Sequence, residues 1–377
     1  MARQLIRAAG YDHGSVDSLA RQIRDWERGK HFPRDWTTAY ATAFDVTEDD
    51  LFGAKEPTRQ GILGIEPGVI DLAPYPSRQG PVAPELVTYF LEQLPGHYKA
   101  DMWLGPRHLI LTVTTQAQLI KELAHAADAP VRRDLLGAGV AYTALLGWLY
   151  QDAGDTDQAR TWRTIALDMA HRSHDPQLIS YALTNKAMLA IDLEDGRTVV
   201  DYAEAASIDE SKLCPKVRIL ALVHQAHGHS MLPARDKKLV DRLLDQAAQL
   251  VDRVDDDHPW GNACRRTLGY VHVQRATAYL RLGAYREAVA LWDELLGTAP
   301  ESARRDNGVF WARQAGALAA IPEPERVVQI ASITASIVDG TGSVRLRQEF
   351  KAIARRAAAW ADTVPGRELT EIISRFA

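Results

Sequence analysis

Residues 143–171, TALLGWLYQDAGDTDQARTWRTIALDMAH, decide the fold. In each half of this stretch, apolar residues recur three or four positions apart, which is the period of a helix that buries one face. The dipeptide Gly154-Asp155 separates the halves and is typical of a tight turn. Small residues stand at Gly147 and Ala159, where they would let two antiparallel helix axes approach closely. The stretch therefore predicts a helical hairpin.

Helical periodicity continues over the rest of residues 85–377. Ala, Leu, Gln, Arg and Glu dominate, and no long stretch alternates between apolar and polar residues as a strand does. We predict an all-α protein with a closing helical pair over residues 310–320 and 325–337. We expect turns at Pro95-Gly96, Gly105-Pro106, Ala129-Pro130, Gly154-Asp155, Asp175-Pro176, Asp195-Gly196, His258-Pro259 and Gly340-Thr341-Gly342.

The hairpins resemble the tetratricopeptide repeat. The first helix of that repeat carries W-x2-L-G-x2-Y, and the second carries A-x3-F followed by Pro. Residues 143–171 match at Leu146-Gly147-x2-Tyr150, Ala159 and Ala166, but lack the first Trp and the aromatic residue after Ala159. Residues 272–300 are closer on the second helix, matching at Ala276-x2-Tyr279, Ala288-x3-Trp292 and Pro300.

The small residues at equivalent positions set the repeat length. They are Gly147, Ala187, Gly228 and Ala276, which lie 40, 41 and 48 residues apart. The standard repeat has a period of about 34 residues. We therefore predict that residues 85–377 form an α-solenoid of degenerate, elongated tetratricopeptide-like hairpins. The alternative is a non-repeating helical bundle that has Ala and Gly at its helix contacts.

Residues 56–84 are predicted to be a linker rich in Pro and Gly. Six of the 18 prolines fall there, at Pro57, Pro67, Pro74, Pro76, Pro81 and Pro84. Proline removes a backbone donor and biases the residue before it away from helical geometry, so a regular helix is not expected. The alternative is an ordered loop that belongs to the second domain. The linker separates residues 1–55 from residues 85–377.

Residues 18–30, SLARQIRDWERGK, place Leu19, Ile23 and Trp26 on one helical face. A short helix over residues 4–9 and a turn over residues 10–14 precede them, and Ser15 or Asp17 can cap the helix. This order is that of a helix-turn-helix module. Seven basic and four acidic residues among residues 1–34 give a local positive balance on a chain with a net charge of −5. The alternative is a solvated amphipathic helix that packs on the repeat domain.

The N-terminal segment resembles the lambda-repressor-like helix-turn-helix domain of the XRE family. The likeness lies in residues 23–30, IRDWERGK, in Pro33, in Val46-Thr47 and in Leu51-Phe52. Residues 147–155 and 305–308, and Gly342-Ser343 with Arg345, resemble the tetratricopeptide half of actinomycete-type regulators of this family. The family domain begins with one further helix, which we expect to be missing in this sequence. The resemblance covers nearly the whole chain.

This resemblance implies a DNA-binding transcription regulator. The helix over residues 18–27 would enter the major groove of double-stranded DNA, with Trp26 in the core and Glu27 in an intramolecular pair. We expect Arg21, Gln22 and Arg24 to read base edges, because Arg suits guanine and Gln suits adenine. Arg28, Lys30 and Arg34 would bind phosphates. A homodimer is expected, because such modules usually read paired half-sites.

The repeat domain is expected to sense an effector and to mediate dimerisation. Stacked first helices of such repeats line a groove that suits an extended peptide or another protein, and a small molecule is a further candidate. By position within the repeats, the groove residues are Tyr181, Asn185, Gln225, His229 and Gln274. The alternative is that these polar side chains face water or brace neighbouring helices.

Catalytic and metal motifs are absent from the sequence. There is no HExxH, Walker-type loop, G-x-S-x-G elbow or Rossmann fingerprint, so we expect neither an enzyme nor a cofactor. His224, His227 and His229 share one helix, and His224 and His227 are one turn apart and could share a metal ion. No third ligand stands at motif spacing, which favours surface or groove histidines over a metal site. Two cysteines and the absence of a long apolar run favour a cytoplasmic protein without membrane segments.

A second function class stays open from the sequence alone. The missing first helix favours a tetratricopeptide interaction scaffold that does not bind DNA. Salt-dependent binding to duplex DNA would distinguish the regulator from the scaffold.

Overall fold

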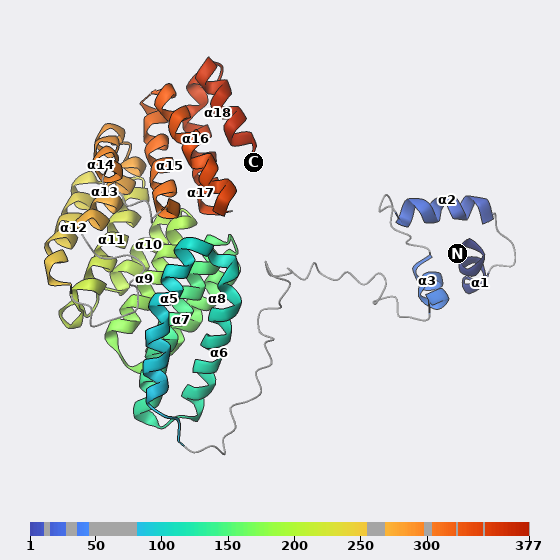
Figure 1. The fold of residues 1–377 in the computed structure, drawn as a ribbon, viewed down its shortest axis with the longest axis horizontal. Helices are drawn as coiled ribbons and strands as arrows, with labels where there is room; N and C mark the ends of the chain where they lie inside the picture. Colours follow the sequence, from blue (N-terminus) through green and yellow to red (C-terminus); the bar gives the residue numbers. More distant parts are fainter. Residues whose placement is uncertain are drawn as a thin grey trace. The chain divides into compact units, whose positions relative to one another are not determined.

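The computed structural model of the chain describes residues 1–10, 16–27, 36–44, 81–254, 268–297, 304–321, 323–341 and 344–376 (Figure 1). Every regular element in these ranges is a helix, which confirms the predicted all-α class. The chain divides into two compact units, Met1–Val69 and Ile70–Ala377. This division falls inside the predicted linker, residues 56–84, most of which lies outside the described ranges.

Three helices build the described part of the first unit. They are α1 (Ala2–Ala8), α2 (Val16–Glu27) and α3 (Thr37–Phe44). Leu5 of α1, Leu19 and Ile23 of α2, and Tyr40 of α3 meet in one buried cluster. The Trp26 ring packs beside this cluster, 6.2 Å from the Tyr40 ring, as expected of a core residue. The apolar spacing along residues 18–30 therefore becomes the buried face of α2.

The second unit is a longer succession of helices, whose bounds are as follows. They are α5 (Glu85–Leu104), η2 (Pro106–His108), α6 (Ile110–Ala126), α7 (Ala129–Asp152), α8 (Thr156–Ser173), α9 (Pro176–Asp192), α10 (Gly196–Ala205), η3 (Glu210–Lys212), α11 (Pro215–Met231), α12 (Lys237–Gln249), η4 (Val251–Arg253), α13 (Leu268–Leu282), α14 (Tyr285–Gly297), α15 (Arg304–Ala320), α16 (Pro324–Thr341), α17 (Val344–Ala357), η6 (Ala358–Trp360) and α18 (Val364–Ser374). The predicted closing pair over residues 310–320 and 325–337 is present as α15 and α16.

Consecutive helices from α6 to α16 pack against one another, and α15 and α16 are visible side by side in Figure 1. In addition, each of α7, α9, α11, α13, α15 and α17 contacts the next helix in this series. We call this series the odd-helix layer. Such an order of neighbours is what stacked hairpins require, because each hairpin then buries its apolar faces against the next one. Membership of the tetratricopeptide class stays a prediction.

Aspartates at the turns start several of the helices. The Asp155 side chain accepts a hydrogen bond from the Gln158 backbone N–H at 3.0 Å, where α8 begins. Asp175 does the same for α9 and Asp195 for α10. Each carboxylate satisfies an N–H group that has no partner inside the helix. The turns predicted at these three aspartates are therefore confirmed.

One predicted break, at Pro95-Gly96, is wrong. Helix α5 runs through Pro95-Gly96 without interruption. Both residues are exposed, so the carbonyl group that loses its bond to the missing proline N–H lies on a side of the helix open to water. The predicted break at Gly340-Thr341-Gly342 is confirmed, because α16 ends at Thr341 and α17 begins at Val344. The predicted break at His258-Pro259 lies outside the described ranges.

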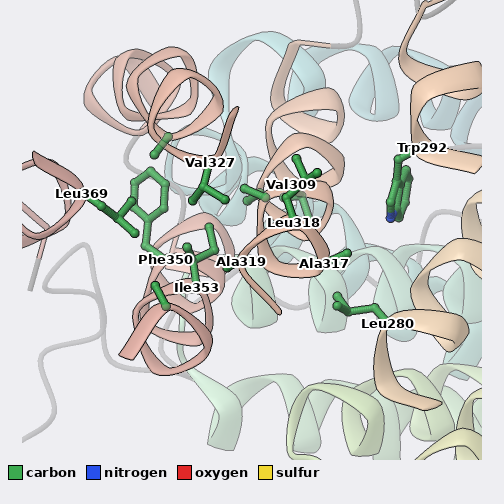
Figure 2. Packing of buried hydrophobic residues seen from close by; sticks show 14 of the residues in the cluster. Leu280, Trp292, Val309, Ala317, Leu318, Ala319, Val327, Phe350, Ile353 and Leu369 are labelled. Carbon is green, nitrogen blue, oxygen red and sulfur yellow. The ribbon is translucent and has the colours of Figure 1, made fainter. Parts of the chain in front are cut away.

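A large apolar cluster fills the C-terminal half of the second unit (Figure 2). Trp292 of α14 is wholly buried there, and its ring stacks on that of Phe310 at 5.5 Å. Phe350 and Ile353 of α17 are also buried in this cluster. The hairpin over residues 272–300 thus buries the aromatic residue at its signature position.

Close packing between α10 and α11 supplies a test of the fold. A Cβ atom added at Gly228 would lie 2.6 Å from Val200 Cγ2 and 3.0 Å from the Val200 backbone nitrogen. We predict that Gly228→Ala lowers the free energy of unfolding by about 1–3 kcal/mol, because backbone atoms cannot yield without moving a helix. Urea unfolding of the full chain measures this.

Gly96→Ala in α5 is the matched control. No atom lies within 4 Å of the added Cβ, and alanine favours the helix over glycine. Its free energy of unfolding should stay level or rise by up to about 1 kcal/mol. Equal losses in both variants would contradict the packing described here.

Candidate functional site

Helix α2 presents a polar face opposite its buried one. Arg21, Gln22 and Arg24 are exposed, whereas Leu19 and Ile23 are each only 4% exposed. The helical period places the two sets on different sides of the helix. Two guanidinium groups and one amide are thus exposed to water on a helix whose opposite face is buried in the core. These groups suit the base edges and phosphates of a nucleic acid.

The predicted phosphate contacts lie outside the part of the chain that the structure describes. They are Arg28, Lys30 and Arg34. Helix α2 ends at Glu27, whose side chain is also outside the described part, so its predicted intramolecular pair stays a prediction.

The five predicted groove residues are in α9, α11 and α13. Tyr181 and Asn185 are buried, and the Asn185 amide donates to the Tyr181 carbonyl of its own helix at 2.8 Å. The Gln225 amide donates to Ser207 Oγ at 3.0 Å, between α11 and the end of α10. His229 is half-buried. Gln274 contacts the cluster described next, whereas Asn185 and Gln225 brace helices, as in the alternative interpretation.

A polar cluster joins α11 to α13. His227 is 4% exposed, and its two ring nitrogens both have partners: Nε2 lies 2.7 Å from Gln274 Oε1, and Nδ1 lies 2.7 Å from Arg281 Nη1. An arginine can only donate, so Nδ1 accepts and the ring proton is on Nε2. His227 is therefore neutral in this arrangement, and burial followed by the charge of Arg281 holds its pKa well below the ordinary value of 6.5.

Arg281 is the centre of this cluster. The groups that act on its charge are Arg313 of α15, Glu349 of α17, Asp192 at the end of α9, and Glu194 in the following turn. Arg313 Nε donates to Glu349 Oε1 at 2.7 Å. We name His227, Gln274, Arg281, Arg313 and Glu349 the Arg281 cluster. It draws its members from four helices of the odd-helix layer.

The guanidinium of Arg281 is held by one neutral partner. Its hydrogen bond to His227 is the contact that the structure gives it, and no carboxylate in the described ranges lies within ion-pair distance. Burial, followed by the charge of Arg313, lowers the pKa of Arg281 to about 10. The side chain is nevertheless only half-buried, so part of its surface stays accessible.

A second buried guanidinium, that of Arg163, stands where the repeat signature has an aromatic residue after Ala159. The side chain is 0% exposed, and Nη1 donates to the Gly147 carbonyl at 2.9 Å. Within the described ranges, Nε and Nη2 have no hydrogen-bond partner. Burial lowers the pKa of Arg163 to about 10, against an opposing effect of Asp192. Gly147 makes room for this side chain, since an added Cβ would lie 2.9 Å from Arg163 Cγ.

Helix α17 contacts α7 and the turn that follows α7. The guanidinium carbon of Arg345 lies 4.6 Å from the centre of the Trp148 ring, and Val344 lies against Gly154 in the turn between α7 and α8. Trp148 Nε1 also donates to Asp101 Oδ2 of α5 at 3.0 Å. Residues of two stretches that carry the family resemblance are therefore in contact.

Sequence reasoning missed most of the Arg281 cluster. It noted His227 among three histidines of one helix, and the structure shows that this side chain is buried and neutral rather than on the surface. It did not single out Arg281, Arg313 or Glu349, which lie far apart in the sequence. In the described ranges, no group of three or more His, Cys, Asp or Glu side chains is placed to hold a metal ion.

Comparison with known proteins adds no relative. No family model matches the chain, and a search of curated proteins gives no match either. None of the helices in the described part combines the length and the apolar character that crossing a membrane requires.

Replacing Arg163 by an apolar residue tests whether its buried guanidinium lacks an ionic partner. We predict that Arg163→Met leaves the free energy of unfolding level or raises it by about 1–4 kcal/mol, because an apolar side chain of similar length replaces a charge with unpartnered donors. Urea unfolding measures this. Arg160→Met on the exposed face of α8 is the control and should stay within about 0.5 kcal/mol of the parent chain. A loss of about 3–5 kcal/mol in Arg163→Met would show that the guanidinium has an ionic partner.

The lowered pKa of His227 predicts a pH dependence. Below about pH 6.5 the unfolded chain binds a proton at this residue that the folded chain does not, so folding becomes less favourable as pH falls. His227→Gln should remove this contribution, which amounts to at most about 1.4 kcal/mol per pH unit. Urea unfolding at about pH 7.5 and about pH 5 measures the difference between variant and parent. His125→Gln, a change of an exposed histidine, is the control. If the free energy of unfolding of His227→Gln depends on pH as that of the parent does, the buried, neutral state of His227 is contradicted.

Proposed function

We propose that the protein is a DNA-binding transcription regulator, in which the first unit reads duplex DNA and the helical array binds an effector and mediates homodimerisation. One observation carries the proposal: α2 exposes Arg21, Gln22 and Arg24 while Leu19 and Ile23 fix its opposite face in a core. The resemblance to XRE-type regulators over the same helix supports it.

The chemistry of α2 suits direct reading of base edges. A helix fits the major groove, where guanine offers two acceptors to an arginine and adenine offers an acceptor and a donor to a glutamine. Trp26 packs against Trp36 and Tyr40, which fixes the C-terminal turn of α2 on its core. A rigidly held helix keeps its polar side chains at a constant spacing, as sequence reading requires.

Dimerisation follows from the same proposal. A module of this size contacts a short half-site, and two copies related by a two-fold axis would read a paired site. The second unit would supply the dimer contacts. A fixed spacing between the two half-sites that the protein selects would therefore indicate the dimer.

Selection from a random duplex library tests this function. The full chain is allowed to bind at two salt concentrations, and the bound duplexes are sequenced. We expect a paired motif to be enriched, with affinity that falls as salt rises. A pool that stays unenriched at both concentrations would contradict the proposal and favour the interaction scaffold.

Variants separate base reading from phosphate contact. Arg24→Ala should relax the preference at one position of each half-site, at a cost of about 1–3 kcal/mol against the preferred base. Lys30→Ala should weaken binding to all sequences alike and reduce the salt slope by about one unit. Equal losses of specificity in both variants would contradict the assigned roles. Arg3→Ala, an exposed change on α1, is the control.

A further inference from the structure

The Arg281 cluster holds one more positive charge than its ion pairs balance. The charge of Arg313 is matched by Glu349 at 2.7 Å. Arg281 has only the neutral ring of His227 as its partner, at 2.7 Å. Charged groups that leave water usually have an opposite charge beside them, because desolvation is otherwise uncompensated. In the described ranges no carboxylate lies within ion-pair distance of Arg281, and the charges of Glu349, Asp192 and Glu194 act on it from farther away.

The remaining donors of Arg281 have the geometry that a carboxylate needs. A guanidinium has five N–H groups in a planar fork, and His227 takes one on Nη1. The edge formed by Nε and Nη2 is left, and such an edge binds both oxygens of a carboxylate through parallel hydrogen bonds. Arg281 is half-buried and so keeps accessible surface, in contrast to the fully enclosed Arg163.

We propose that Arg281, positioned by His227 within the odd-helix layer, binds the carboxylate group of a small, singly charged ligand that is the effector of this protein. The identification as effector site rests on the proposed function, whereas the carboxylate site itself stands on the geometry of the cluster. His227 is a positioning residue here, because its neutral Nδ1 accepts a hydrogen bond from Nη1 and leaves the Nε and Nη2 donors for the ligand.

The surrounding charges select a single negative charge. Asp192, Glu194 and Glu349 act on Arg281 from beyond ion-pair distance. They would repel a doubly charged ion such as phosphate more strongly than a carboxylate. A positively charged group on the same ligand would meet these acidic side chains. Three probes therefore test this selectivity: acetate carries one negative charge, glycine adds a positive group to the carboxylate, and inorganic phosphate is doubly charged.

Chemical modification of the full chain tests the site without knowledge of the natural ligand. Phenylglyoxal adds to the neutral form of a guanidine group, so an accessible arginine of lowered pKa reacts early. Peptide mapping by mass spectrometry should show Arg281 reacting at least about tenfold faster than the exposed Arg133, since each pKa unit is worth a factor of ten. Saturating acetate, compared with chloride at equal ionic strength, should slow Arg281 at least about fivefold and leave Arg133 unchanged.

Three outcomes would overturn the proposal. In the first, phenylglyoxal does not modify Arg281. In the second, Arg281 is modified at the same rate in acetate and in chloride. In the third, phosphate slows the modification of Arg281 more than acetate does. An arginine with a purely structural role, stabilised by the C-terminal end of α13 and by nearby carboxylates, would give the first or the second outcome. Protection by acetate or glycine, and weaker protection by phosphate, supports the site.

A variant gives an independent readout. In the parent chain, acetate should raise the thermal midpoint above that in chloride at equal ionic strength, and Arg281→Met should abolish this difference. The same two salts with Arg133→Met should give the parent's difference. Acetate dependence that persists in Arg281→Met would overturn the site. These measurements contain no DNA, so failure of the library selection would leave a positive result here intact, and the reverse also holds.

Discussion

Close approach of helix axes at small residues is the constraint on which the packing of the second unit depends. An added Cβ would lie 2.9 Å from Arg163 Cγ at Gly147 and 2.6 Å from Val200 Cγ2 at Gly228. Ala187 and Ala276, at the equivalent positions of other hairpins, are fully buried. Helices that meet this closely leave little room for large side chains at the contact, so the few polar groups caught there are strongly desolvated.

Buried charge is the consequence that connects this packing to function. Arg163 and Arg281 both have pKa values lowered to about 10, chiefly by burial, and Asp192 acts on both of them. Arg163 is enclosed and holds the Gly147 carbonyl, so its role is confined to packing. Arg281 is half-buried as a residue, and its printed partner is the neutral ring of His227, so its other donors are the ones that we assign to a carboxylate ligand. The same fold thus contains one fully enclosed arginine and one half-buried arginine.

The sequence predicted the features that depend on near neighbours. Turns at Asp155, Asp175 and Asp195 could be found because each aspartate caps a helix only two or three residues on. Pro95-Gly96 was misjudged because an exposed proline can be accommodated when water satisfies the released carbonyl. The Arg281 cluster was out of reach, because Arg281 and Glu349 look like ordinary surface residues of separate helices and only the three-dimensional packing brings them together. Its position within a repeat placed Gln225 on the predicted groove face, but the sequence could not show that its amide donates a hydrogen bond to Ser207 Oγ.

The central claim is that α2 reads DNA, and amide hydrogen exchange tests it most directly. The full chain is compared alone, with the duplex selected from the library, and with a duplex of the same length and composition in scrambled order. The account predicts slower exchange over α2 with the selected duplex, and a smaller effect with the scrambled one at the same salt concentration. Unchanged exchange over α2 while the protein is bound to the selected duplex would contradict it.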